Sequence, residues 1–315
     1  IKSPLVGITK TNIMNIFYRA YQLSSYIKKE NIRIIHVSWT KDLLLSALVK
    51  LFSGNKISII YHRQMKITRY KKDIYHNFIY KSINIVLVIT KALSEDCKKF
   101  LPIDNDRIIK LSYGIALPDN KNTFDKKLLF DEIELQENIF TIGVFSRIEE
   151  QKGQHLIIEA LNILHEKNIQ LLIVGHCMDI SYQNDLRKLI EKYNMHDRVA
   201  FKPFIESPMK IMPMLDLIIL PTYEETFGLV VAESMLMGTP VIGSNAGGVP
   251  EIINDNNNGL LFESRNSKSL SKKIISIYES EELRIKLSNN AKIFASEEYN
   301  YEKHFSKLTT ILQKL

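Results

Sequence analysis

The chain alternates short apolar runs rich in β-branched residues with longer segments in which apolar residues recur every three or four positions. Runs of the first kind predict buried strands, and segments of the second kind predict helices, among them amphipathic helices at 13–29 and 301–315. This rhythm is typical of α/β proteins built on parallel sheets. The predicted strands cover residues 32–39, 56–62, 84–90, 107–113, 140–146, 170–175, 198–204, 215–221 and 239–244.

A polar stretch at residues 116–138 separates the first four predicted strands from the rest, with turn residues and charges but no sustained strand pattern. It predicts two doubly wound, Rossmann-like domains that face each other across a cleft. The predicted parts are an N-terminal domain (1–118), a linker (119–138), a C-terminal domain (139–298) and a final helix (299–315) able to pack back on the N-terminal domain. Since the chain opens with Ile1 and no signal pattern, we expect the N-terminal domain to be incomplete at its start.

Composition narrows the class of protein. With 45% hydrophobic and 24% charged residues among 315, the chain should fold. Its net charge of +7 is spread along the sequence without a long block, which fits an anionic partner such as a membrane surface. We expect no nucleic acid partner, because there is no basic tail, zinc-finger spacing or base-stacking platform. No apolar run approaches the roughly 20 residues of a membrane span, so we expect a cytoplasmic protein, peripheral on the inner membrane face if it meets a membrane.

The two cysteines, Cys97 and Cys177, lie far apart in the sequence and lack the spacing of metal ligands. This pattern favours a reducing compartment over a disulfide framework. We expect both side chains to be buried as small apolar groups.

Two carboxylates flank a predicted junction between a loop and a helix. The strand at 215–221 leads through TYEETFG into LVVAESMLMG, which places Glu225 in the loop and Glu233 about two turns into the helix. The amides of Phe227, Gly228 and Leu229 at the helix start could bind an anion between the two acids. A phosphate flanked by two polyols, as in a sugar nucleotide, suits this arrangement. Alternatively, Glu225 caps the helix and Glu233 lies on the surface.

Other candidate ligands come from two further turns. Arg147 and Lys152 bracket the turn after the strand at 140–146, where two cations could neutralise a departing diphosphate, or simply lie in an exposed basic loop. Gly247 and Gly248 precede a predicted short helix at 249–253, where backbone can approach a phosphate or sugar, although most such pairs only form a turn.

The combination of these motifs resembles a known family. The order SRxxxxKG, IVGH, DLIILPTYEETFGLVVAESMLMGTPVIGSNAGGVPEI and NGLLF is similar to the C-terminal domain of retaining glycosyltransferases of the family 4 type, which have the GT-B fold. The resemblance is strong over residues 139–262 and looser over 30–115. The family's glycine-rich loop after its first strand has no counterpart here. Pro203 stands where a glycine often ends the strand near the base, so the motifs do not specify the nucleobase.

The resemblance implies roles for individual residues. Arg147 and Lys152 match the cations that bind the donor diphosphate. Glu225 matches the acid that holds the transferred sugar, and Glu233 the acid that holds the ribose. Phe227, Gly228 and Leu229 match the loop whose amides contact sugar and phosphate. His62 follows a strand, as does a cleft histidine of the family; by itself it is more typical of a core or surface histidine.

We therefore expect a retaining glycosyltransferase that moves a sugar from a nucleoside-diphosphate sugar to a glycan or lipid-linked acceptor hydroxyl, as in polysaccharide biosynthesis. The family implies that no metal or other cofactor is required. One alternative is a non-catalytic GT-B partner subunit of a glycosyltransferase complex. Another is a nicotinamide-dependent oxidoreductase, which the lack of a GxGxxG motif after a strand disfavours.

Overall fold

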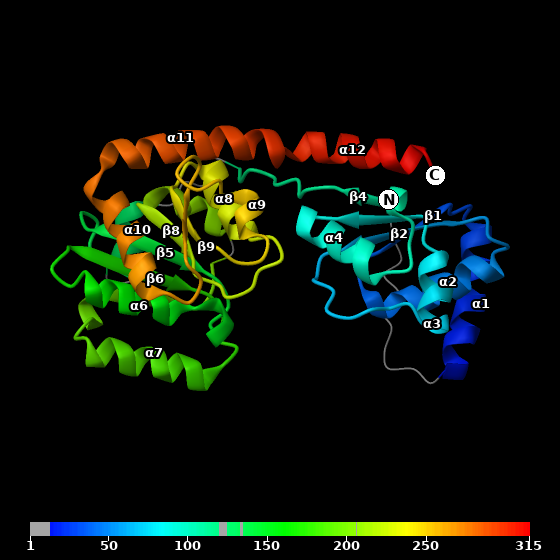
Figure 1. Ribbon diagram of the computed structural model, residues 1–315, viewed down its shortest axis with the longest axis horizontal. Coiled ribbons are helices and arrows are strands. Elements are labelled where there is room, and N and C mark those ends of the chain that lie inside the picture. The colour runs from blue at the N-terminus through cyan, green and yellow to red at the C-terminus, as the bar shows by residue number, and fades with distance from the viewer. Residues whose placement is uncertain (1–12, 120–124, 133–134, 206) are drawn as a thin grey trace. The chain divides into compact units, whose positions relative to one another are not determined.

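A computed structural model describes residues 13–119, 125–132, 135–205 and 207–315 (Figure 1). The chain forms two compact units. Unit 1 comprises Ile1–Tyr113 and Glu302–Leu315, and unit 2 comprises Gly114–Tyr301. Each is a layered α/β structure around its own parallel sheet.

Unit 1 is built on a four-stranded parallel sheet of order β1-β2-β3-β4. Its strands are β1 (Ile34–Val37), β2 (Ser58–Arg63), β3 (Ile85–Val88) and β4 (Ile108–Lys110). Its helices are α1 (Ile13–Lys29), α2 (Leu43–Phe52), α3 (Ile74–Lys81), α4 (Lys91–Phe100) and α12 (Tyr301–Gln313), with short 3-10 turns η1 (Thr40–Asp42) and η2 (Asn105–Arg107).

Alternation along the strands of unit 1 directs apolar side chains to two faces of the sheet. Ile35 packs with the helices α1 and α2, whereas its neighbour Ile34 joins the opposite cluster. That cluster consists of strand residues such as Ile60 and Leu87 and receives Leu308 of α12. The last helix of the chain thus covers one face of the first sheet.

Unit 2 has a six-stranded parallel sheet of order β10-β9-β8-β5-β6-β7. Its strands are β5 (Phe140–Phe145), β6 (Ile169–Val174), β7 (Val199–Lys202), β8 (Leu217–Leu220), β9 (Val241–Ser244) and β10 (Leu260–Phe262). Its helices are α5 (Lys126–Glu132), α6 (Gln154–Ile163), α7 (Ile180–Lys192), α8 (Leu229–Met237), α9 (Val249–Ile252), α10 (Ser267–Glu279) and α11 (Glu281–Glu298), with 3-10 turns η3 (Glu150–Lys152), η4 (His196–Arg198), η5 (Pro208–Lys210) and η6 (Met212–Met214).

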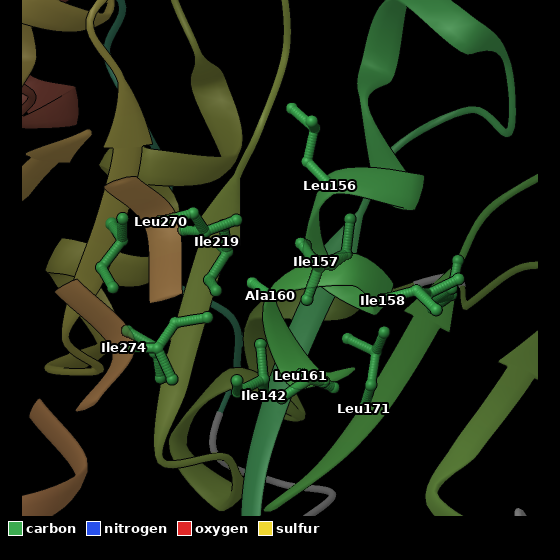
Figure 2. Close-up of a cluster of buried hydrophobic side chains, with 14 of the residues drawn as sticks. Ile142, Leu156, Ile157, Ile158, Ala160, Leu161, Leu171, Ile219, Leu270 and Ile274 are labelled. Atoms are coloured by element: carbon green, nitrogen blue, oxygen red, sulfur yellow. The ribbon is translucent and has the colours of Figure 1, made fainter. Parts of the chain in front are cut away.

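Helices cover both faces of this second sheet, which explains the unbroken apolar strands of the sequence. Every residue of β6 is buried. Figure 2 shows Ile157 and Leu161 of α6 packed with Ile142 of β5 and with Ile274 of α10, all fully buried. This core holds the strands, and therefore the loops at their carboxyl ends, in fixed positions.

The structure differs from the sequence predictions in several places. The predicted linker, of which 120–124 and 133–134 lie outside the described residues, contains α5, whose Phe130 is fully buried. The boundary between the units follows Tyr113, earlier than the predicted boundary at residue 118. Residues beyond it belong to unit 2, where the Ile115 amide donates a hydrogen bond to the carbonyl of Tyr299. The strand β10 was not predicted, since three residues are too few to show a pattern. Cys97 is buried as expected, but Cys177, in the turn after β6, is exposed.

Candidate functional site

The strand order of unit 2 marks one point on the sheet edge where a ligand can enter. From β5 the chain proceeds outward through β6 and β7, then returns to β8 on the other side of β5 and continues to β9 and β10. The loops after β5 and β8 therefore lie side by side at a topological switch point, the usual ligand position in doubly wound folds. All of the predicted site residues except His62 lie in this unit.

The loop after β5 is fixed by a buried amide side chain. Gln154 is fully buried, and its Nε2 donates to Ser146 Oγ (2.9 Å) and to the carbonyl oxygen of Arg147 (2.8 Å). The Arg147 side chain itself is 58% exposed and pairs with Glu149, with 2.9 Å between Nη2 and Oε1. Arg147 thus has a fixed backbone and a guanidinium that solvent reaches.

Lys152 and Glu225 form an ion pair between the two loops, with 2.9 Å between Lys152 Nζ and Glu225 Oε2. The two side chains are only 16% and 24% exposed, so water screens the pair less than it screens a surface pair. The other oxygen, Oε1, accepts from the amide of Thr226 (3.2 Å). Glu225 is therefore held in one position, and Lys152 keeps two further N–H donors for a ligand.

Backbone contacts hold the loop after β8 directly against the loop after β5. The amide of Tyr223 donates to the carbonyl of Gln151 (2.9 Å), which also accepts from Thr222 Oγ1 (3.2 Å). Gly153 has φ +70°, and a Cβ at this position would lie 2.3 Å from the carbonyl oxygen of Pro221. Only glycine lets the chains approach this closely.

Gly247 and Gly248 support Glu225 from the other side. A Cβ on Gly247, whose φ is +58°, would lie 2.1 Å from the carbonyl oxygen of Glu225, and one on Gly248 would lie 2.1 Å from that of Thr226. The amide of Gly248 donates to the Glu225 carbonyl (2.7 Å). The two glycines are needed for the packing of one loop on another, a structural role beyond the ligand contact that the sequence suggested.

Gly228, with φ +98°, is the N-cap of α8, and no side chain among the described residues caps this helix start. The helix begins at Leu229, whose side chain is partly exposed, whereas Phe227 is buried edge-on against Tyr299. Glu225 is not the cap. The amides at this helix start point along a dipole that favours an anion.

Glu233 is the fifth residue of α8, about one turn from its start and nearer the start than the predicted two turns. Its side chain is partly buried, and burial raises the pKa of its carboxyl to about 7. A solvated surface acid would titrate near 4.5, so the surface alternative does not describe this residue.

His155, next to this site, was not predicted from the sequence. His155, at the start of α6, lies between two tyrosines, with Nδ1 2.8 Å from Tyr182 Oη and Nε2 2.8 Å from Tyr223 Oη. Tyr182 Oη also accepts from the His155 amide (3.2 Å). Burial lowers the pKa of His155 and favours the neutral ring. This network holds Tyr223, the residue before Glu224 and Glu225, in place. No motif in the sequence predicts it.

His62 lies in unit 1, in β2, and forms a cluster there. Its ring stacks on His36 (centroids 5.7 Å apart) and lies 6.4 Å from the ring of Tyr113. Nδ1 of His304, from α12, contacts the carbonyl of Ser112 (2.7 Å) beside this cluster. Burial, then the neighbouring His36 and His304, lower the pKa of His62 to about 4, and its Nε2 is buried without a hydrogen-bond partner among the described residues.

The described part of the chain contains no group of three His, Cys, Asp or Glu side chains arranged to hold a metal ion. Within the same residues, none of the helices is both long and apolar enough to cross a membrane.

Comparison with known proteins gives a consistent set of relatives. The family model described as glycosyl transferases group 1 matches residues 125–294, more than half of the chain. N-acetyl-alpha-D-glucosaminyl L-malate synthase of Bacillus anthracis is 25% identical over 301 residues, 93% of this chain and 77% of that protein. An uncharacterized glycosyltransferase of Methanocaldococcus jannaschii is 27% identical over 73% of this chain, which spans only 60% of that relative.

Several solved structures match most of the chain. A glycosyltransferase from Rickettsia africae has a TM-score of 0.88 at 21% identity, covering 98% of this chain and 83% of its own. Anabaena HepE, crystallised with UDP and glucose, has a TM-score of 0.81 at 21% identity, covering 95% and 81%. These likenesses show the GT-B fold of glycosyltransferases.

Proposed function

The chain belongs to the glycosyl transferases group 1, and we propose that it is a retaining, metal-independent member of this family. Its place in the family supports an enzyme that transfers a sugar from a nucleotide sugar. In this proposal it transfers a hexose-type sugar to a hydroxyl group of a glycan or a lipid-linked acceptor. The observation that carries the proposal is the Lys152–Glu225 pair, which joins the two loops at the switch point of unit 2.

The donor would lie across the start of α8. Lys152, Arg147 and the helix dipole would stabilise the diphosphate. Glu225 would accept hydrogen bonds from the sugar hydroxyls, and Glu233 from those of the ribose. Two cations from one loop and a helix dipole from the neighbouring loop could stabilise a leaving diphosphate without a metal, which supports metal independence.

The occupation of both Glu225 oxygens bears on the mechanism. One pairs with Lys152 and the other with the Thr226 amide, which suits an orienting group better than a covalent nucleophile. In the proposed step the acceptor oxygen forms its bond to the anomeric carbon on the face from which the diphosphate leaves. The bond between that carbon and the diphosphate oxygen breaks, and the same diphosphate oxygen takes the acceptor proton. The configuration is retained.

The first donor to test is UDP-glucose, since Anabaena HepE was crystallised with it. Calorimetry against UDP, GDP, ADP and CMP identifies the base, and NMR of the product from the matching sugar nucleotide reports the anomeric configuration. Chelation by EDTA should leave transfer unchanged, whereas a loss restored by a divalent cation would overturn metal independence.

Separate variants test the ion pair. We expect Lys152→Ala and Glu225→Gln each to lower kcat/KM at least about 100-fold, because each removes a charge that contacts the donor. Lys167→Ala is the matched control: Lys167 also pairs with a glutamate, Glu279, at 2.8 Å in unit 2, but it precedes β6 and so lies at the amino ends of the strands, opposite the two loops. Full transfer by Glu225→Gln would contradict its role. Failure of the folded protein to bind any nucleotide would favour the non-catalytic partner subunit.

A further inference from the structure

The net charge of the chain is divided very unevenly between the two units. Unit 1 contains 23 Lys and Arg against 8 Asp and Glu, a net charge of +15. Unit 2 contains 19 against 27, a net charge of −8. The modest +7 of the whole chain therefore hides a strongly basic unit, whose partner should be anionic.

Within unit 1, one segment combines exposed cations with exposed apolar side chains. Between β2 and the middle of α3 the chain exposes a set that we call the basic–apolar surface: Met65, Lys66, Arg69, Tyr70, Lys72, Ile74, Tyr75 and Phe78. Ile74 is 91% exposed, which is unusual for a branched apolar side chain. Asp73 is the only acid between Asp42 and Glu95, and it caps α3 by accepting from the His76 amide.

The segment that carries this surface is anchored to unit 1. Ile67 is buried, and the amide of Lys71 donates to the carbonyl of Phe100 (2.9 Å). Arg63 Nη2 donates to the carbonyl of Lys66 (2.8 Å). The exposed side chains therefore extend from a backbone with specific tertiary contacts.

Helix geometry gathers the apolar members on one side of α3. Ile74 and Phe78 stand at positions i and i+4, which share a face, and Tyr75 borders it, while Tyr80 is buried on the opposite side of the helix. The cations Lys66, Arg69 and Lys72 precede this face along the chain. Aliphatic and tyrosine side chains next to lysine and arginine are the composition of surfaces that enter the headgroup region of a bilayer.

We propose that the basic–apolar surface docks unit 1 on an anionic lipid bilayer, the cations contacting headgroup phosphates and the face of α3 entering the interface. A stacking surface for nucleic acid presents aromatic rings along a basic groove, whereas the most exposed apolar side chain here, Ile74, is aliphatic and better suited to acyl chains. Docking would bring the enzyme to a lipid-linked acceptor, and in this respect the inference rests on the proposed function.

Sedimentation of the full chain with vesicles tests the proposal without any sugar donor. Binding should be much stronger to vesicles of phosphatidylcholine with roughly one third phosphatidylglycerol than to phosphatidylcholine alone, and should weaken with salt. Since each basic residue near an anionic surface contributes about fivefold, the triple variant Lys66→Ala/Arg69→Ala/Lys72→Ala should bind at least about 30-fold more weakly. Ile74→Ser/Tyr75→Ser should weaken binding even though it removes no charge.

The control removes the same charge elsewhere in unit 1 through Lys29→Ala/Lys41→Ala/Lys56→Ala, three exposed lysines outside the surface. An equal loss in this variant would overturn the proposed surface and leave only diffuse attraction. Equal binding to neutral and anionic vesicles, or displacement from vesicles by single-stranded DNA at lower concentration than by added vesicles, would overturn the lipid assignment. Nucleotide binding measured on the same variants separates this outcome from failure of the proposed function, because the donor site lies in unit 2.

Discussion

The two units each place candidate site residues at a parallel sheet, but they hold these residues in different ways. In unit 2, Lys152 and Glu225 are joined to each other and to the surrounding backbone, and the Glu225 carbonyl leaves no room for a Cβ at Gly247. In unit 1, His62 lies among aromatic rings and its Nε2 has no hydrogen-bond partner within the described residues. The hydrogen-bonded network around Lys152 and Glu225 holds both side chains in position before a ligand binds. The buried Nε2 of His62 would gain a hydrogen-bond partner only from a ligand.

Two buried groups, Glu233 in unit 2 and His62 in unit 1, should respond to pH in opposite directions. Burial favours the neutral form of both Glu233 and His62, but the neutral form is the protonated one for the carboxyl and the deprotonated one for the imidazole. Acid therefore relieves the cost of burying Glu233 and increases the cost of burying His62.

The largest effect should come from disruption of the loop packing in unit 2. Gly247→Ala places a Cβ 2.1 Å from the Glu225 carbonyl oxygen at φ +58°, so the backbone of both loops must move. We expect the free energy of unfolding to fall by about 3 kcal/mol or more and nucleotide binding to be lost. Urea unfolding and calorimetry measure the two effects.

Gly238→Ala is the matched control for this variant. Gly238 has φ +79° in the same unit, but its Cβ would meet nothing closer than 3.7 Å. It should lose only about 1 kcal/mol through backbone strain and keep nucleotide binding. Similar losses in both variants would mean that the φ angle, and not the contact with Glu225, requires glycine at position 247.

The next effect is a loss of folding stability at acidic pH that is caused by His62. Its pKa is about 4 in the folded protein and about 6.5 when unfolded, so the unfolded chain binds more protons between these values. The stability that neutral His62 contributes is present above pH 6.5 and is lost as the pH falls towards 4, to the extent of roughly 3 kcal/mol.

His62→Gln should remove this loss, so the difference in unfolding free energy between variant and wild type should change with pH across that window. Urea titrations at several pH values measure the difference, and His165→Gln, which replaces an exposed histidine of unit 2, controls for the loss of an imidazole. A constant difference between pH 4 and 6.5 would show that His62 is not desolvated.

Glu233 should show an effect of similar size on stability, with the opposite sign. Its folded pKa of about 7 exceeds the unfolded value of about 4.5, so stability is full below pH 4.5 and falls as the pH rises to 7, by about 3 kcal/mol. If the carboxylate holds the ribose, donor affinity should rise about tenfold from pH 6 to pH 8 as the acid ionises. Glu233→Gln should abolish both trends, whereas Glu191→Gln, on the exposed side of α7, should keep them.

Much of this architecture could be predicted from the sequence because it depends on local patterns. The β-branched runs located nine strands, and the loop with Glu225 followed from the strand before it and the helix after it. The contacts that form the site could not be predicted from the sequence. Lys152 and Glu225 are 73 residues apart, and glycine is required at position 247 because of a carbonyl from another loop. The charge division was present in the composition but became visible only when the unit boundaries were known.

The assignment of α12 to unit 1 has a consequence for biosynthesis. The face of the first sheet that contains Ile60 and Leu87 is covered by α12, and all of Gly114–Tyr301 is translated between the sheet and this helix. At about 5 to 20 residues per second, a ribosome needs roughly 10 to 40 s for that interval. During this time that face of the first sheet has no helix over it, and chaperones that bind apolar strands could cover it until α12 is made.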